Sequence, residues 1–197
     1  VQNQSSLREV TSDWTQFRGP NRDGVAPDQK TSLNWSSPPV LRWKTPAGEG
    51  HSSIITFGNS VITMEQDGQE ELVIARSLDN GKTKWKHAVK TRWDDFMSGV
   101  GPRSTPTIAD GKLYAVFTDG SLVCLEAGSG KLVWQTMIVS EGHDFPEWGL
   151  SFSPLVWNDL VIVTPGGEDS AARAYRKDSG ELAWSSAFHG EGVYLSP

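Results

Sequence analysis

Residues that could bind a metal ion are crowded into one short segment. Glu141, His143, Asp144 and Glu147 lie within seven residues, so carboxylate oxygens and an imidazole nitrogen are locally available. Their spacing matches no metal motif, and charged loops between structural units are commonly solvated. We therefore interpret this segment as a charged loop and keep a metal site as the alternative.

Two adjacent carboxylates follow a tryptophan, in the order Trp93, Asp94, Asp95. Such a pair could bind calcium or act as a catalytic base. Neighbouring residues of an extended segment point in opposite directions, so the two acids do not easily share one target. We expect an acidic loop here and assign no catalytic residue and no metal site.

Several other classes of chemistry and partner lack support in the sequence. No Gly-x-Ser-x-Gly, Walker or Gly-x-Gly-x-x-Gly context occurs, and the single cysteine, Cys124, excludes an internal disulfide and a Cys-x-x-Cys-His haem attachment within these residues. The formal net charge is -6 and no basic run occurs, which gives no electrostatic support for binding nucleic acid. The longest apolar runs, such as residues 160–163, have the length of a strand, so no transmembrane segment is predicted.

The elements that would position any site follow a repeat. A Gly-x-x-x-Trp step occurs three times, and its tryptophans lie 49 and then 50 residues apart. A repeat of this length, containing short apolar runs separated by turn signals, predicts an all-β fold, a β-propeller of four-stranded antiparallel blades with the same architecture as WD40 repeats. The three steps are Gly81/Trp85, Gly130/Trp134 and Gly180/Trp184.

The repeat divides the chain into an arm and a partial propeller. Residues 1–38 form an irregular arm that we expect to pack on the propeller, because it is rich in turn formers but keeps aromatic residues. Residues 39–197 hold blades at about 50–89, 101–138 and 150–188. A lone last strand is predicted around Trp43, and the first strand of a fourth blade begins at about 193. Three blades with two loose strands would leave the ring open.

Specific stretches carry a family resemblance. Residues 101–114, continuing through 122–125 and 130–134, resemble the PQQ-like β-propeller repeat family, and so do residues 148–156. The opening residues 14–24 look like the N-terminal signature of exported bacterial members. The resemblance implies a periplasmic or extracellular protein, similar to the outer-membrane-assembly lipoprotein propeller and to the propellers of quinoprotein alcohol dehydrogenases.

The same resemblance implies a structural role for the repeated glycines and tryptophans. In quinoprotein alcohol dehydrogenases the pattern Ala-x-Asp-x-x-x-Gly-Lys-x-x-Trp locks neighbouring blades together. The first repeat keeps Ala75, Gly81 and Trp85 but has Ser77 at the acidic position. We therefore expect the three glycines and three tryptophans to dock blades rather than to bind a quinone.

The most plausible ligand surface is the rim where the first strands of the blades begin, because propellers gather loop residues around their axis. A cation, hydroxyl groups and aromatic rings there would suit a protein or a polar organic ligand; the alternative is that these residues only cap the strands. The candidate residues are Arg103, Ser104, Trp148, Ser151, Phe152 and Tyr194.

These observations favour a non-catalytic exported binding or scaffold module with no cofactor. The alternative is part of a quinoprotein dehydrogenase, with PQQ and calcium held mostly by residues outside this chain. If the 197 residues are the whole polypeptide, copies are expected to associate, with the strand around Trp43 of one copy completing a blade begun at Tyr194 in another.

Overall fold

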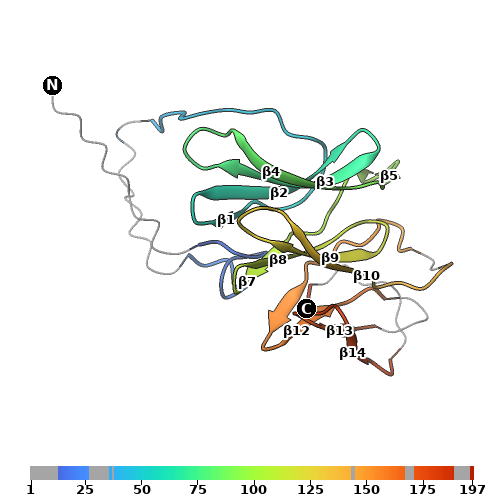
Figure 1. Ribbon diagram of the computed structural model, residues 1–197. Coiled ribbons are helices and arrows are strands. Elements are labelled where there is room, and N and C mark those ends of the chain that lie inside the picture. The colour runs from blue at the N-terminus through green and yellow to red at the C-terminus, as the bar shows by residue number, and fades with distance from the viewer. Residues whose placement is uncertain (1–12, 27–35, 37, 143–144, 167–170, 189–195) are drawn as a thin grey trace.

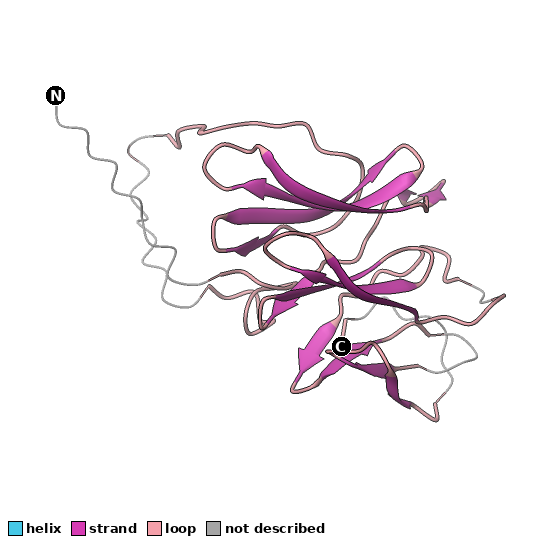
Figure 2. Cartoon of the chain, viewed as in Figure 1, coloured by secondary structure: helices cyan, strands magenta, loops and turns pink. Residues whose placement is uncertain are grey.

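The structure is a computed structural model that describes residues 13–26, 36, 38–142, 145–166, 171–188 and 196–197. Every regular element in these residues is a β-strand (Figure 2). The strands form three four-stranded antiparallel sheets and one two-stranded sheet. The predicted all-β architecture of four-stranded blades is therefore confirmed, and the three sheets are called blades one, two and three.

Each blade pairs its four strands in chain order, and the blades follow one another across the molecule (Figure 1). Blade one contains β1 (Ile55–Phe57), β2 (Ser60–Asp67), β3 (Glu70–Ser77) and β4 (Thr83–Val89). Blade two contains β7 (Thr107–Ala109), β8 (Lys112–Val116), β9 (Ser121–Glu126) and β10 (Leu132–Met137). Blade three contains β11 (Leu155–Trp157), β12 (Leu160–Val163), β13 (Arg173–Arg176) and β14 (Leu182–Ser185). A hairpin of β5 (Asp94–Asp95) and β6 (Gly99–Val100) lies between blades one and two in the chain.

Tight turns set the register of the strands. Between β7 and β8, Asp110 and Gly111 both have positive φ, at 50° and 73°. Positive φ at both central residues is the requirement of a type I′ turn, whose twist matches that of the strands it joins. The turn therefore brings Ile108 opposite Leu113, and Thr107 opposite Tyr114.

Tryptophan rings lie over glycines of the following blade. A Cβ atom added to Gly130 would lie 2.4 Å from the ring of Trp85, and one added to Gly180 would lie 2.7 Å from the ring of Trp134. The same packing joins Trp43 to Gly81, at 2.6 Å. Only a residue without a side chain allows this approach, and all three glycines have φ between 70° and 74°.

A small residue lies opposite the tryptophan of each blade, on the neighbouring strand. Ala75, Cys124 and Ala174 are the cross-strand partners of Trp85, Trp134 and Trp184, and all three small side chains are fully buried. Burial raises the pKa of the Cys124 thiol to about 11, so this cysteine is an inert core residue. The small residue lets the large ring lie flat on the sheet.

Two apolar cores fill the spaces between the blades. One core lies between blades one and two, and the other lies between blades two and three, so blade two is covered on both faces. The first core includes Ile62, Met64, Val73, Leu113, Phe117 and Leu125. The second includes Tyr114, Leu122, Phe152, Val161, Val163 and Tyr175.

The first strands converge, and a chain of hydroxyl groups joins them just before they begin. The backbone N–H of Ser53 donates to Thr105 Oγ1 at 3.0 Å, and the N–H of Thr105 donates to Ser153 Oγ at 3.0 Å. The N–H of Ser153 donates to Ser196 Oγ at 2.9 Å. Ser196 thus takes the position that Thr105 and Ser153 hold in blades two and three. Tyr194, where a fourth blade was predicted to begin its first strand, lies outside the described residues.

The arm crosses the free edges of the first strands. The N–H of Thr56 in β1 donates to the carbonyl of Trp14, and the N–H of Ile108 in β7 donates to the carbonyl of Thr15, at 2.9 and 2.8 Å. Further along the arm, Arg22 Nη1 is 3.4 Å from the carbonyl of Pro154, next to β11. The arm therefore satisfies edge groups of blades one and two and reaches blade three.

The segment around Trp43 is extended but forms no regular strand. Among the described residues, 40–44 pair with no strand, and Val40 and Leu41 are exposed. Trp43 anchors the segment through its ring on Gly81 and an indole N–H that donates to the carbonyl of Leu78 at 2.8 Å. Trp134 makes the equivalent bond to the carbonyl of Lys177, at 2.9 Å.

The docking geometry predicts a specific cost for a methyl group at Gly130. Gly130→Ala should lower the free energy of unfolding by about 2 kcal/mol more than Gly111→Ala, because both residues have positive φ but only Gly130 lies against a ring. Chemical denaturation would measure both. Gly128→Ala, in the same turn with open space around it, should change stability least. Equal losses for Gly130→Ala and Gly111→Ala would show that the contact with Trp85 contributes nothing.

Candidate functional site

The predicted rim residues fall into different environments at the ends of the blades where the first strands begin. Ser104 is buried and its Oγ has no partner among the described residues. Phe152 is buried in the core between blades two and three, so it offers no surface to a ligand. Trp148 is 40% exposed, and Ser151 Oγ lies 3.4 Å from the carbonyls of Trp148 and Gly149. Tyr194 lies outside the described residues.

Arg103 braces the β5–β6 hairpin. Its guanidinium donates to the carbonyls of Ser98 at 2.8 Å, of Gly99 at 3.3 Å and of Gly101 at 3.3 Å. These carbonyls belong to the returning half of the hairpin and the residue that follows it. The cation predicted to face a ligand therefore has a structural task, which is to hold a loop of the rim in place.

The two adjacent carboxylates of the sequence also act locally. Asp94 pairs with Arg92 at 2.8 Å. Asp95 Oδ1 accepts hydrogen bonds from the N–H groups of Met97 and Ser98, at 3.0 and 2.7 Å. Hydrogen bonds from Ser98 hold the pKa of Asp95 below its ordinary value. The two side chains do not share a target, as the alternation of an extended segment predicts.

The hairpin presents an apolar tip that sequence reasoning missed. Phe96 is fully exposed and Met97 is 75% exposed. The available signal was the position of two large apolar residues between Asp95 and Ser98, in a segment outside the repeated strands. Apolar residues that belong to the core would instead lie within the repeated strand-like runs of the blades.

The base of the hairpin is anchored to the next loop along the rim. The ring of Trp93 lies against Gly149, where an added Cβ would come within 3.0 Å of it. Trp93 also meets Phe145 edge-on, with ring centroids 6.4 Å apart. The hairpin and the loop that carries Trp148 are therefore packed together.

The crowded acidic segment forms no metal site among the described residues. His143 and Asp144 lie outside them, and Glu141 and Glu147 are exposed. Across the described part of the chain, no group of three or more His, Cys, Asp or Glu side chains is placed to hold a metal ion.

A buried carboxyl group lies between blades one and two near the same rim. Glu71 is fully buried and accepts hydrogen bonds from the N–H and the hydroxyl of Thr118, at 3.0 and 2.6 Å. Burial outweighs these bonds and raises the pKa of Glu71 to about 7. His87 projects into the same seam beside Phe117, and burial lowers its pKa.

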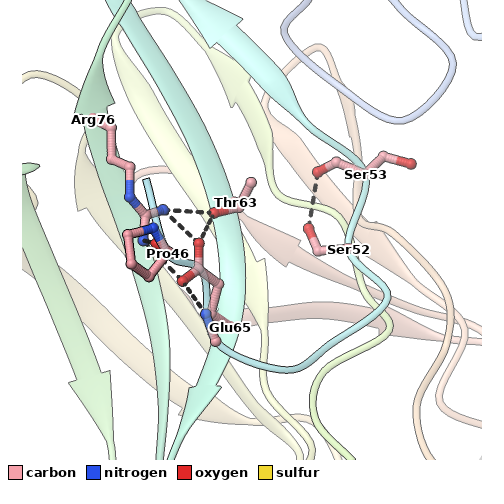
Figure 3. Close-up of polar contacts among 7 residues, drawn as sticks. Pro46, Ser52, Ser53, Thr63, Glu65 and Arg76 are labelled. Carbon is pink, nitrogen blue, oxygen red and sulfur yellow. Dashed lines mark hydrogen bonds and ion pairs between the residues drawn. The ribbon is translucent and has the colours of Figure 1, made fainter. Parts of the chain in front are cut away.

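A cleft of about 430 Å³ lies on the face of blade one that points away from blade two, beneath residues 46–48. Its floor is apolar, with Leu72 and Ile74, and Arg76 and Glu65 form an ion pair on its wall (Figure 3). Glu65 also accepts bonds from Thr63 and from the N–H of Gly48. Burial would raise the pKa of Glu65, but the hydrogen bonds from Arg76, Thr63 and Gly48 outweigh it and hold the pKa below its usual value. This pair ties the segment after Trp43 to the blade.

Three blades with converging first strands, joined by tryptophan rings on glycines, define the protein as part of a β-propeller. A family model described as outer membrane protein assembly factor BamB matches residues 69–195. The match covers more than half of the chain, so the chain belongs to this family of PQQ-like repeat proteins.

The relatives include enzymes that are much longer than this chain. Quinohemoprotein alcohol dehydrogenase ADH IIB of Pseudomonas putida is 29% identical over 119 residues, which are 57% of this chain and 17% of the relative. A europium-containing methanol dehydrogenase superposes with a TM-score of 0.53 and 20% identity, covering 71% of this chain and 25% of its own. Quinohemoprotein alcohol dehydrogenase ADHIIG of Pseudomonas putida HK5 superposes with a TM-score of 0.53 and 20% identity. The superposition covers 74% of this chain and 22% of that enzyme. This chain spans a quarter or less of the length of each of these relatives.

No helix long and apolar enough to cross a membrane occurs in the described residues.

The buried carboxyl predicts a pH dependence of stability. Between about pH 4.5 and 7 the folded protein retains a proton on Glu71 that the unfolded chain has lost, so the free energy of unfolding should fall as pH rises, by up to about 3 kcal/mol. The lowered pKa of His87 contributes an opposite slope, and Glu71→Gln should remove the falling one in urea denaturation measured across the window. Glu70→Gln, at the exposed neighbouring position, should keep it. A falling slope that persists in Glu71→Gln would assign it to another group.

Proposed function

We propose that this protein is a non-catalytic, exported binding or scaffold module built on PQQ-like propeller blades. The course of the arm supports this proposal. Residues 13–22 lie along the first strands of blades one and two and reach blade three, so the chain itself covers the side on which the first strands converge. Binding is then left to the rim loops at the ends of the blades.

The described residues do not fit PQQ and calcium. A cofactor on the propeller axis would share space with the arm, whose carbonyls already accept the edge N–H groups of Thr56 and Ile108. Calcium prefers several carboxylate and carbonyl oxygens at one point. The two rim carboxylates considered for it are directed to Arg92 and to the turn of their own hairpin.

The alternative function is that of a quinoprotein dehydrogenase of which this chain is one portion. The similarity to quinohemoprotein alcohol dehydrogenase ADH IIB favours it. Under this hypothesis the catalytic acid and most cofactor ligands would come from residues outside this chain, because the similarity spans only 17% of that enzyme.

The proposed setting and partners follow from the family and the rim. Membership of a family described as an outer membrane assembly factor supports an exported, periplasmic or extracellular location. The partner would be a protein or a polar organic ligand bound at the rim, where Trp148 is half-exposed and Arg103 and Asp95 hold the β5–β6 hairpin in position. The net charge of -6 makes nucleic acid an unfavourable partner.

A cofactor titration distinguishes the two functions. Calorimetry of this chain with PQQ and calcium should show no binding, and reduction of a redox dye with primary alcohols should stay at the level of the buffer. A dissociation constant of about 1 μM, or dye reduction that depends on quinone, would favour the dehydrogenase. Holding the calcium concentration constant with and without PQQ controls for effects of the ion on the fold.

The exposed face of blade three predicts self-association of the 197-residue chain. Trp184 is 40% exposed, whereas Trp85, covered by blade two, is 9% exposed, and Leu182 beside Trp184 is also exposed. Light scattering at increasing concentration should show a mass above the 21.6 kDa of one copy. Leu182→Lys should shift the mass toward one copy, and Leu132→Lys, at the equivalent place in blade two, should not. A concentration-independent monomer would refute this prediction.

A further inference from the structure

The β5–β6 hairpin projects from the rim, and hydrogen bonds made by Asp95 and Arg103 hold its backbone in place. Asp95 closes the turn from within by accepting the N–H groups of Met97 and Ser98. Arg103 holds the returning half through the carbonyls of Ser98 and Gly99. The N–H of Gly101 donates to the carbonyl of Trp93 at 3.0 Å and closes the base. A loop braced in this way loses little conformational freedom when it binds.

The tip that this framework supports is apolar and exposed. Phe96 and Met97 project at the point where the chain reverses, and neither is covered by another part of the described chain. Aromatic and methionine side chains are enriched at the centres of protein interfaces, because they bury a large area with few rotatable bonds or adapt to irregular surfaces. Trp148 adds a half-exposed ring on the neighbouring loop, which is joined to the hairpin through Trp93 and Gly149.

Carboxylates lie on the segments that border the base of the hairpin. The turn between β2 and β3 lies beside the hairpin because Arg92 Nη1 donates to the carbonyl of Gly68 at 3.0 Å. The backbone of Glu49 approaches Gly101 closely, where an added Cβ would be 2.7 Å from the Glu49 carbonyl. The exposed acids on these bordering segments, on the loop that packs against Trp93 and on the hairpin are Glu49, Asp67, Glu70, Asp94 and Glu147. Asp94 is paired with Arg92, and the other four form no ion pair with a described residue.

We propose that this hairpin is the docking element for a protein segment that carries aliphatic side chains flanked by lysine or arginine. This inference rests on the proposed binding function and names its partner class. Phe96 and Met97 supply the apolar contact, and the carboxylates on the bordering segments attract the basic flanks and orient them. The same carboxylates repel the anionic surface of a bilayer and the phosphates of nucleic acid, so the geometry favours a basic protein segment over both.

Three synthetic peptides of equal length test the proposal with the 197-residue chain. One alternates leucine with lysine, the second leucine with glutamate, and the third serine with lysine. Fluorescence anisotropy should show binding of the leucine–lysine peptide alone, weakened at least about tenfold when salt is raised from about 0.05 to 0.5 M. Equal binding of the serine–lysine peptide would show that charge alone accounts for the binding, and it would overturn the role of the tip.

A matched pair of variants locates the contact. The double change Phe96→Ser with Met97→Ser should weaken leucine–lysine binding at least about tenfold, while Val40→Ser with Leu41→Ser, which also removes two exposed apolar side chains, should leave it within about twofold. All four positions are exposed, so both proteins should keep the unfolding midpoint of the parent. Unchanged binding after the hairpin substitution, or equal loss after both, would overturn the inference.

Two further outcomes separate this inference from the proposed function. Adsorption of the protein to vesicles of phosphatidylcholine with phosphatidylglycerol that depends on Phe96 and Met97 would identify a membrane anchor and overturn the partner class. Peptide binding that is lost in Trp148→Ser but retained in the hairpin variant would overturn the hairpin as the docking element while leaving a rim-binding module in place. Failure of the proposed function itself has a different signature, which is quinone binding or dye reduction.

Discussion

An indole ring packed flat on the glycine of the following blade is the interaction on which the rest of this structure depends. It sets the spacing of two sheets at their outer strands, because neither the ring nor the glycine backbone can yield. It explains the fully buried alanine or cysteine on the strand beside each ring, where a larger side chain would lift the indole from the sheet. Once the outer strands are held in this way, the apolar cores close between the blades and the first strands converge.

Much of this arrangement is accessible from sequence because the relevant constraints are local or periodic. The steps at Gly81/Trp85, Gly130/Trp134 and Gly180/Trp184 predict the number and length of the blades, and turn residues such as Asp110-Gly111 predict the hairpins. What the period does not reveal is which tryptophan meets which glycine. Gly130 receives the ring of Trp85 rather than that of Trp134, four residues away, and this follows only from the packing of one sheet on another.

The rim was harder to predict, because its residues obey no repeat. Phe152 is a residue type that often contacts ligands. It lies in the core because its position, directly before Ser153, faces the space between blades two and three. Arg103 and Asp95 have the charges expected of a binding site, but both form hydrogen bonds with the hairpin. Phe96 and Met97 were missed because exposure depends on the hairpin that lifts them, and two strands of two residues each leave almost no periodic signal.

The segment from Trp43 to Gly48 has a consequence for assembly. A molecule whose two end faces match can add copies head to tail without limit, and such heterologous contacts build filaments when they do not close into rings. In this chain the glycine that a neighbour's tryptophan would need, Gly81, is already beneath Trp43, and the ion pair of Arg76 with Glu65 holds the following residues over the same face. The chain thus covers the face that carries Gly81 with its own backbone, as capping repeats do in solenoid proteins, whereas Trp184 and Leu182 on the face of blade three are exposed among the described residues.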